Sequence, residues 1–90
     1  MQDSKNIHLL KLKIGDLIRK LRAENNYKSL NKFALSYDIN RANLSKIECG
    51  KVGCSLVMAW KISEALGIKL SEFVKLLEDE LGENFKLIDE

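Results

Sequence analysis

Hydrophobic residues recur along this chain at intervals of three and four positions, which is the spacing of a helix with one buried face. Ile14, Leu17, Ile18 and Leu21 form the clearest set. Polar turns separate five such segments, and we expect helices at residues 11–25 with a start at 11 or earlier, 30–37, 41–49, 56–66 and 72–81. The lack of proline and the low glycine content, 5 residues in 90, agree with an all-α fold.

Residues with helix-capping side chains precede four of these segments. Each can accept a hydrogen bond from a free amide of the first turn, and they are Ser29, Asn40, Ser55 and Ser71. Glycines, which end helices through a left-handed backbone, follow three segments, at Gly50, Gly67 and Gly82. The last eight residues, ENFKLIDE, alternate loosely in hydrophobicity and leave three alternatives open: a strand, a frayed tail or an arm that binds a partner.

Four aromatic residues, Phe33, Tyr37, Trp60 and Phe73, stand at helical spacing among aliphatic neighbours. This placement predicts that they fill the core rather than form stacking platforms for nucleic-acid bases. Ninety residues suffice for one such core and not for two, so we expect a single domain.

The charge of the chain is divided unevenly, although its net value is only +2. Residues 1–53 contain eleven lysines and arginines against five acidic residues, whereas residues 54–90 contain four against eight. The first part therefore carries +6 and the second −4. Such an asymmetry is expected where one face of a protein meets a polyanion and another faces water or a protein partner.

Several classes of function lack their residues in this sequence. Cys49 and Cys54 are the only cysteines and His8 is the only histidine, so a four-ligand zinc site cannot be built from them, and we expect reduced thiols and no cofactor. No Ser-His-Asp set, phosphate loop or paired-carboxylate motif is present, so we expect no enzyme. No apolar stretch approaches the roughly 20 residues of a membrane span, which predicts a cytoplasmic protein without a membrane partner.

The segment at 41–49 combines a buried face with an unusual outer face. Leu44, Ile47 and Glu48 share one side of the helical wheel. The opposite side and its edges carry small, polar or basic residues: Ala42, Ser45, Lys46, Cys49, Arg41 and Asn43. Small side chains allow close approach and the cations supply donors, as needed to enter a DNA major groove about 12 Å wide and contact base edges. With segment 30–37 and the turn between them, this pattern predicts a helix-turn-helix.

Three stretches, taken in order, resemble the lambda-repressor-like, or Xre-type, helix-turn-helix family: IGDLIRKLR, SLNKFALSYDINRANLSKIECGK and SLVMAWKISEALGIKLSEF. The resemblance covers residues 14–73. It implies a compact five-helix DNA-binding domain whose second and third helices form the helix-turn-helix, and a dimeric repressor that binds double-stranded DNA. Residues 1–13 would extend the first helix, and residues 74–90, the end of the fifth helix and a tail, are a candidate for dimerisation.

The resemblance also assigns roles to individual residues. The positions implied to contact DNA are Ser29, Leu30, Asn40, Arg41, Ala42, Asn43, Ser45, Lys46 and Lys51. Among them, Arg41, Ala42 and Lys46 are implied to face base pairs. The amides that follow Ser29 are implied to hold a phosphate, because a helix start presents free donors and positive potential.

Other positions depart from the family pattern or complete it. Leu30 stands where the family often has a glutamine whose amide contacts phosphate, so that contact is lost or passes to Lys28 or Lys32. Arg22 and Glu48 match two positions that the family pairs between its first and third helices, which implies a buried structural ion pair.

The second half of the chain suits a different function. Its acidic character and apolar side chains fit a protein-interaction module, for example an antitoxin, or a contact with a partner such as a toxin or RNA polymerase. The apolar residues that we expect at a homodimer interface are Leu76, Leu81 and Phe85. Salt-dependent binding to duplex DNA would favour the DNA-binding function over the interaction module.

Overall fold

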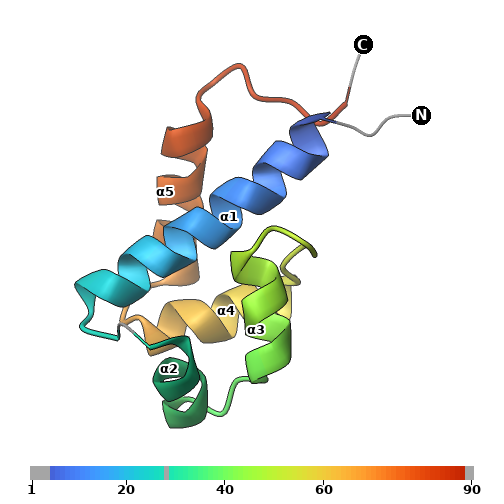
Figure 1. Ribbon diagram of the computed structural model, residues 1–90. Coiled ribbons are helices and arrows are strands. Elements are labelled where there is room, and N and C mark those ends of the chain that lie inside the picture. Colours follow the sequence, from blue (N-terminus) through green and yellow to red (C-terminus); the bar gives the residue numbers. More distant parts are fainter. Residues whose placement is uncertain (1–4, 28, 89–90) are drawn as a thin grey trace.

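The computed structural model describes residues 5–27 and 29–88 and contains five helices in this part of the chain. They are α1 (Lys5–Glu24), α2 (Leu30–Ser36), α3 (Arg41–Glu48), α4 (Leu56–Ala65) and α5 (Leu70–Leu81). The described residues contain no strand, which confirms the all-α prediction (Figure 1).

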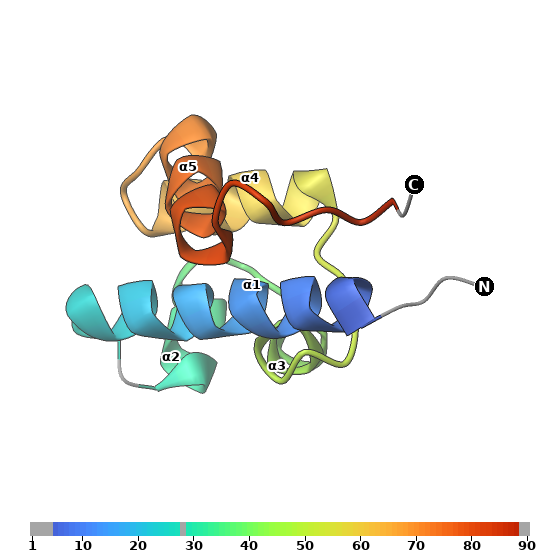
Figure 2. The same cartoon turned by 90° about the horizontal axis from the view of Figure 1, so that it is seen from above.

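The longest helix, α1, runs through the middle of the molecule. Seen from above, α2 and α3 lie on one side of α1, and α4 and α5 lie on the other (Figure 2). α1 contacts α3 and α5, α2 contacts α3, and α4 contacts α5. The two helix pairs are therefore joined through α1, and its contact with α3 determines how the helix-turn-helix is held.

A single core lies where the five helices meet. Each helix contributes at least one buried apolar side chain to it: Leu17 and Ile18 from α1, Phe33 and Ala34 from α2, Leu44 and Ile47 from α3, Ile62 from α4 and Phe73 from α5. Full burial of one large apolar side chain stabilises a fold by about 1.5–3 kcal/mol. Contacts shared among all five helices thus hold α2 and α3 in place.

Three of the four predicted caps are formed. The side-chain oxygens of Ser29, Asn40 and Ser55 accept hydrogen bonds from backbone amides three residues later, at 3.2, 2.8 and 3.0 Å. The prediction that Ser71 caps the fifth helix is wrong, because α5 begins at Leu70 and its N-cap position, Lys69, makes no side-chain cap.

α1 begins at Lys5, earlier than residue 11. Its first turn is held from outside, because Asn6 Nδ2 donates a 2.6 Å hydrogen bond to the Lys86 carbonyl oxygen. The chain after α5 accordingly returns to the start of α1 (Figure 1). Residues 83–88 of this tail form no strand, and residues 89–90 lie outside the described part.

The prediction that Trp60 belongs to the core is wrong, because 55% of this residue is exposed. The buried face of α4 carries Ala59, Ile62 and Ser63. Trp60 precedes Ile62 by two positions, which places it on nearly the opposite side of the helix. Phe33 and Phe73 are buried as predicted. The first five residues of α4, Leu56–Trp60, are all apolar, so periodicity alone did not identify its buried face.

Candidate DNA-binding surface

The turn between α2 and α3 fixes the direction in which α3 leaves the core. Asp38 adopts a left-handed backbone with φ of 56°, which aspartate tolerates better than most residues. Ile39 is buried, and its amide donates a 2.9 Å hydrogen bond to the Ala34 carbonyl oxygen. The side chain and the backbone of the turn are both anchored, so α2 and α3 form one rigid unit.

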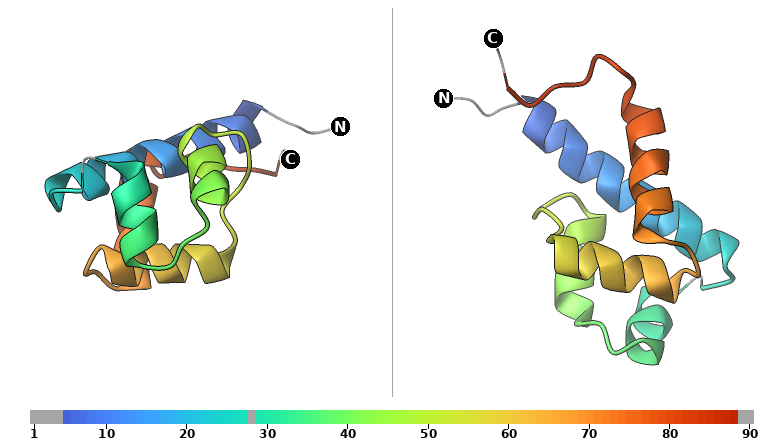
Figure 3. Two further views of the ribbon diagram at one scale, coloured as in Figure 1. Left: turned by 60° about the horizontal axis from the view of Figure 1, so that its bottom comes forward. Right: turned by 180° about the vertical axis from the view of Figure 1, so that it is seen from behind.

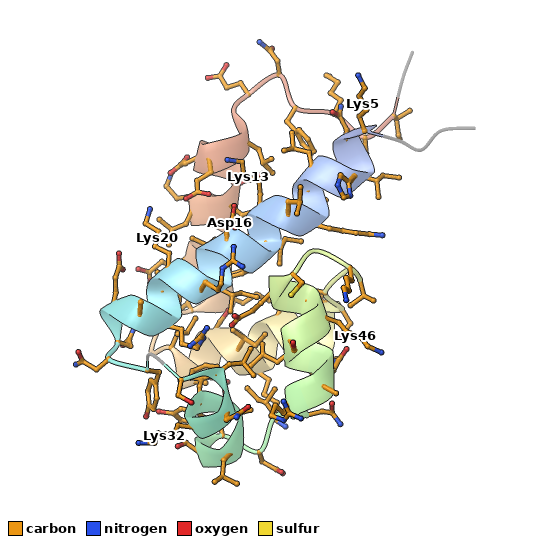
Figure 4. The ribbon with its side chains drawn as sticks, in the orientation of Figure 1. Lys5, Lys13, Asp16, Lys20, Lys32 and Lys46 are labelled. Atoms are coloured by element: carbon orange, nitrogen blue, oxygen red, sulfur yellow. The ribbon has the colours of Figure 1, made fainter. Side chains whose placement is uncertain are left out.

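The outer face of α3 is open and carries small or basic side chains. Leu44, Ile47 and Glu48 are buried, as the helical wheel predicts. Arg41, Ala42, Lys46 and Cys49 are exposed, and Asn43 and Ser45 are half-buried. Lys46 points outward from α3 (Figure 4). α3 stands at the edge of the molecule with α2 beside it (Figure 3). A second surface can therefore approach this face of α3 closely.

Polar groups flank α3 at both ends. At its start, Asn40 uses its side-chain oxygen for capping. At its end, Lys51 is exposed, and its amide donates a 2.9 Å hydrogen bond to the Lys46 carbonyl oxygen, so both lysines belong to the same helix end.

The start of α2 offers backbone rather than side-chain donors. Ser29 is half-buried, and its hydroxyl accepts from the Lys32 amide. The Leu30 side chain packs against the core, so only its amide can serve a ligand at this end. Lys32 is exposed, whereas Lys28 lies outside the described residues.

Arg22 of α1 and Glu48 of α3 form an ion pair with two hydrogen bonds. Arg22 Nε donates to Glu48 Oε2 and Arg22 Nη2 donates to Glu48 Oε1, both at 2.9 Å. Arg22 Nη1 also donates to the Tyr27 carbonyl oxygen at 2.8 Å. The two charged side chains are only 9% and 4% exposed. This forked geometry provides hydrogen bonds to both buried charges and ties α3 to α1.

A close approach of α1 to the end of α3 was not predicted from the sequence. A Cβ atom at Gly15 would lie 2.7 Å from the Ile47 carbonyl oxygen, so only glycine fits there. Arg19 Nη1 donates a 3.2 Å hydrogen bond to the Glu48 carbonyl oxygen beside it. A lone glycine inside a helical pattern is the signal that could have indicated this contact.

An aromatic cluster joins Tyr27 to Phe33 and Tyr37, and this role of Tyr27 was not predicted from the sequence. The hydroxyl groups of Tyr27 and Tyr37 lie 2.8 Å apart in a hydrogen bond, which is the main cause of the raised pKa of Tyr37. Both rings contact Phe33, with centroids 5.3 Å from its centroid. The cluster supports α2 and the loop before it.

The two cysteines differ in exposure, because Cys49 is exposed and Cys54 is half-buried. Both are free, and burial raises the pKa of the Cys54 thiol to about 11, so this thiol stays protonated at neutral pH. Residues 5–27 and 29–88 contain no cluster of three side chains able to hold a metal ion. Within the same part of the chain, no helix is both long and apolar enough to cross a membrane.

Comparison with known proteins identifies the class to which this fold and surface belong. The helix-turn-helix family model matches residues 18–73, which is more than half of the chain. The chain therefore belongs to the helix-turn-helix family and is a DNA-binding transcriptional regulator. It is 42% identical over 71 residues to the control protein C.MunI from Mycoplasma sp, and this alignment covers 79% of the chain and 96% of that protein.

Proposed function

We propose that the chain is a dimeric repressor that reads an operator in the DNA major groove with α3. The observation that carries this proposal is the outer face of α3, where the small side chains of Ala42 and Ser45 lie beside the exposed cations Arg41 and Lys46. Sequence is read in the major groove by donors and apolar groups that reach base edges. The buried ion pair and the anchored turn hold this face rigid, and rigidity reduces the cost of binding.

The contacts divide into reading and anchoring. Arg41, Ala42 and Lys46 are proposed to face base pairs, with Ser45 providing space between them. The anchoring contacts to phosphates are proposed for the remaining candidates: the backbone amides near Ser29 and Leu30, and the side chains of Asn40, Asn43 and Lys51. Phosphate contacts fix the position of a protein on the duplex without reading its sequence.

The name of the Mycoplasma relative, a control protein, agrees with a regulatory role. We propose that the chain works in the cytoplasm, with residues 14–73 as the DNA-binding domain. Residues 5–13 form the part of α1 that precedes this domain, and residues 74–88 contain the end of α5 and the described part of the tail.

A selection and titration experiment tests the proposed function. The full chain is expected to bind random duplex DNA with an affinity that falls as salt rises, because released counterions drive such binding. It is also expected to enrich a palindromic sequence from a random pool, because a symmetric dimer reads two half-sites about 34–36 Å apart. Binding without salt dependence, or no enriched sequence, would contradict the proposal and favour the protein-interaction module.

A second copy of the chain is the proposed partner on DNA, because a single reading head buries only about 600–1,000 Å². Leu56, Val57 and Trp60 of α4 are 65%, 79% and 55% exposed. The interface candidates from the sequence are partly used within the chain: Leu76, Leu81 and Phe85 are all half-buried, and Leu76 packs against the core. We therefore propose that the exposed face of α4 forms the centre of the dimer interface.

Sedimentation of charged variants distinguishes the two surfaces. Val57→Asp is expected to shift the chain from dimer to monomer, because it buries an unpaired carboxylate at the interface. Leu35→Asp is the matched control, because Leu35 is equally apolar and 84% exposed on α2. Loss of the dimer in Phe85→Asp but not in Val57→Asp would place the interface on the tail. A monomeric wild-type chain on palindromic DNA would contradict dimerisation itself.

One groove favours a protein partner as a second candidate function. It lies between α1 and α5 and has a volume of about 610 Å³. Its apolar lining includes Leu21, Ile68 and Leu76. Its charged lining is mostly acidic, since Glu24, Glu72, Asp79 and Glu80 outnumber Lys20, which pairs with Glu80. A toxin or RNA polymerase segment with basic and apolar side chains would fit this groove while α3 remains free.

A further inference from the structure

The first part of α1 has an unusual charge pattern. Residues 5–15 contain Lys5, His8, Lys11 and Lys13 and no aspartate or glutamate. The first turn of a helix favours acidic residues, because the amide ends there create positive potential. α1 has no acidic residue in its first turn. This part of the helix also precedes residues 18–73, which the helix-turn-helix family model matches.

Helical spacing assigns two of these residues, Lys11 and His8, to the side of α1 that meets the end of α3. Gly15 lies against the last carbonyl groups of α3, and a Cβ atom at Gly50 would meet the Leu12 side chain. Residues four and seven positions apart share a helix face. Lys11 precedes Gly15 by four positions and His8 precedes it by seven, so both lie on the face of α1 that meets the end of α3.

Lys13 lies on a different face of the same helix segment. It precedes Lys20 by seven positions, and Lys20 forms an ion pair of 3.7 Å with Glu80 of α5. Lys13 and Lys20 both lie along the side of α1 that faces α5 (Figure 4). Lys11 and Lys13 therefore lie on opposite sides of α1, although only one residue separates them in the sequence.

The end of α3 continues this positive charge. Lys46 and Lys51 are exposed there, and residues 49–63 contain no aspartate or glutamate. Glu48, the acidic residue of α3, is buried and paired with Arg22. Lysines thus continue from the outer face of α3 across the Gly50 turn to α1, where His8 adds a hydrogen-bonding ring, and we call His8, Lys11, Lys46 and Lys51 the basic ridge.

We propose that the α1 part of the basic ridge, Lys11 with His8, is a second DNA contact that binds backbone phosphates beyond the end of α3. This inference rests on the proposed function of α3. Its support is the continuity of the ridge with that surface and the charge complementarity to a polyanion with one phosphate per roughly 1.7 Å of duplex axis. Contacts of this kind raise the affinity for every sequence alike and add to the salt dependence.

Titrations of Lys11→Gln and Lys13→Gln at several salt concentrations test the inference. Each lysine that neutralises one phosphate contributes about 0.9 to the slope of log affinity against log salt. Lys11→Gln is expected to lower that slope by about one unit per subunit and to weaken operator and scrambled duplexes by the same factor. Lys13→Gln is expected to match the wild type. Equal slopes for the two variants would overturn the inference.

A conservative variant separates charge from packing, because Lys11 is half-buried. Lys11→Arg is expected to keep the wild-type slope, whereas a packing defect would lower the thermal stability of both Lys11 variants. Neutral methylphosphonate linkages can replace single phosphates along the operator. At the phosphate that Lys11 contacts, this replacement should weaken binding of the wild type and leave the affinity of Lys11→Gln unchanged. If no such position exists, the α1 contact is absent.

Failure of this inference differs visibly from failure of the proposed function. If α3 does not read DNA, Arg41→Ala will leave the preference for operator over scrambled duplex unchanged. If only the α1 contact is absent, Arg41→Ala will lose that preference while Lys11→Gln behaves as the wild type.

Discussion

Replacing Glu48 by alanine is expected to lower the free energy of unfolding by about 3–5 kcal/mol, because it leaves the Arg22 guanidinium buried without its counter-charge. The carboxylate accepts two hydrogen bonds of 2.9 Å from Arg22, and its side chain is only 4% exposed. For a domain of this size, such a loss lowers the melting temperature by more than about 10 °C. The same pair joins α1 to α3, so DNA binding should weaken as well.

Thermal and urea unfolding measure this effect against Glu64→Ala. Glu64 is an exposed residue of α4, and surface substitutions usually change stability by no more than about 0.5 kcal/mol. The double variant Arg22→Met with Glu48→Leu removes both charges and should recover part of the loss, since apolar replacement of a buried pair is often tolerated. Equal melting temperatures for Glu48→Ala and Glu64→Ala would show that the pair does not stabilise the fold.

Removal of the Arg41 or Lys46 side chain is expected to reduce operator binding far more than binding to scrambled DNA. A side chain that donates to a base edge discriminates against the wrong base by about 1–3 kcal/mol, or roughly 5- to 150-fold. Both side chains are exposed on or beside the outer face of α3 and are free to reach a groove. Truncation to alanine leaves the buried face of α3 intact, so the fold should be preserved.

Lys51→Ala is the matched comparison for these two variants. Lys51 lies beyond the end of α3 and is proposed to contact a phosphate, so its loss should weaken both duplexes equally and lower the salt slope by about one unit per subunit. The measurement is a binding titration of the three variants on operator and scrambled duplexes. If Arg41→Ala and Lys46→Ala weakened both duplexes to the same extent, α3 would not be the reading helix.

Local patterns in the sequence were sufficient to predict the helix-turn-helix itself. Ser29 and Asn40 determine where α2 and α3 start, because their side chains bond to amides only three residues away. Leu44 and Ile47 lie on one side of α3, and Ala42 and Lys46 lie on the opposite side. This spacing determines which side of α3 is buried. The family resemblance indicated the Arg22 and Glu48 pair, which joins residues distant in sequence and has no local signal. The assignment of individual DNA contacts stays a prediction.

Only the tertiary structure showed which helix faces are buried against other parts of the chain. Periodicity states which residues share a face, but in α4 apolar residues surround the helix, so only packing revealed that Ala59 and Ile62 face inward and Trp60 outward. The tail returns to the first turn of α1, where the Asn6 side chain donates a hydrogen bond to the Lys86 carbonyl oxygen. The close contact at Gly15 determines which face of α1 meets the end of α3. Each of these relations joins segments far apart along the chain, and their free energy arises from contacts that a local pattern does not contain.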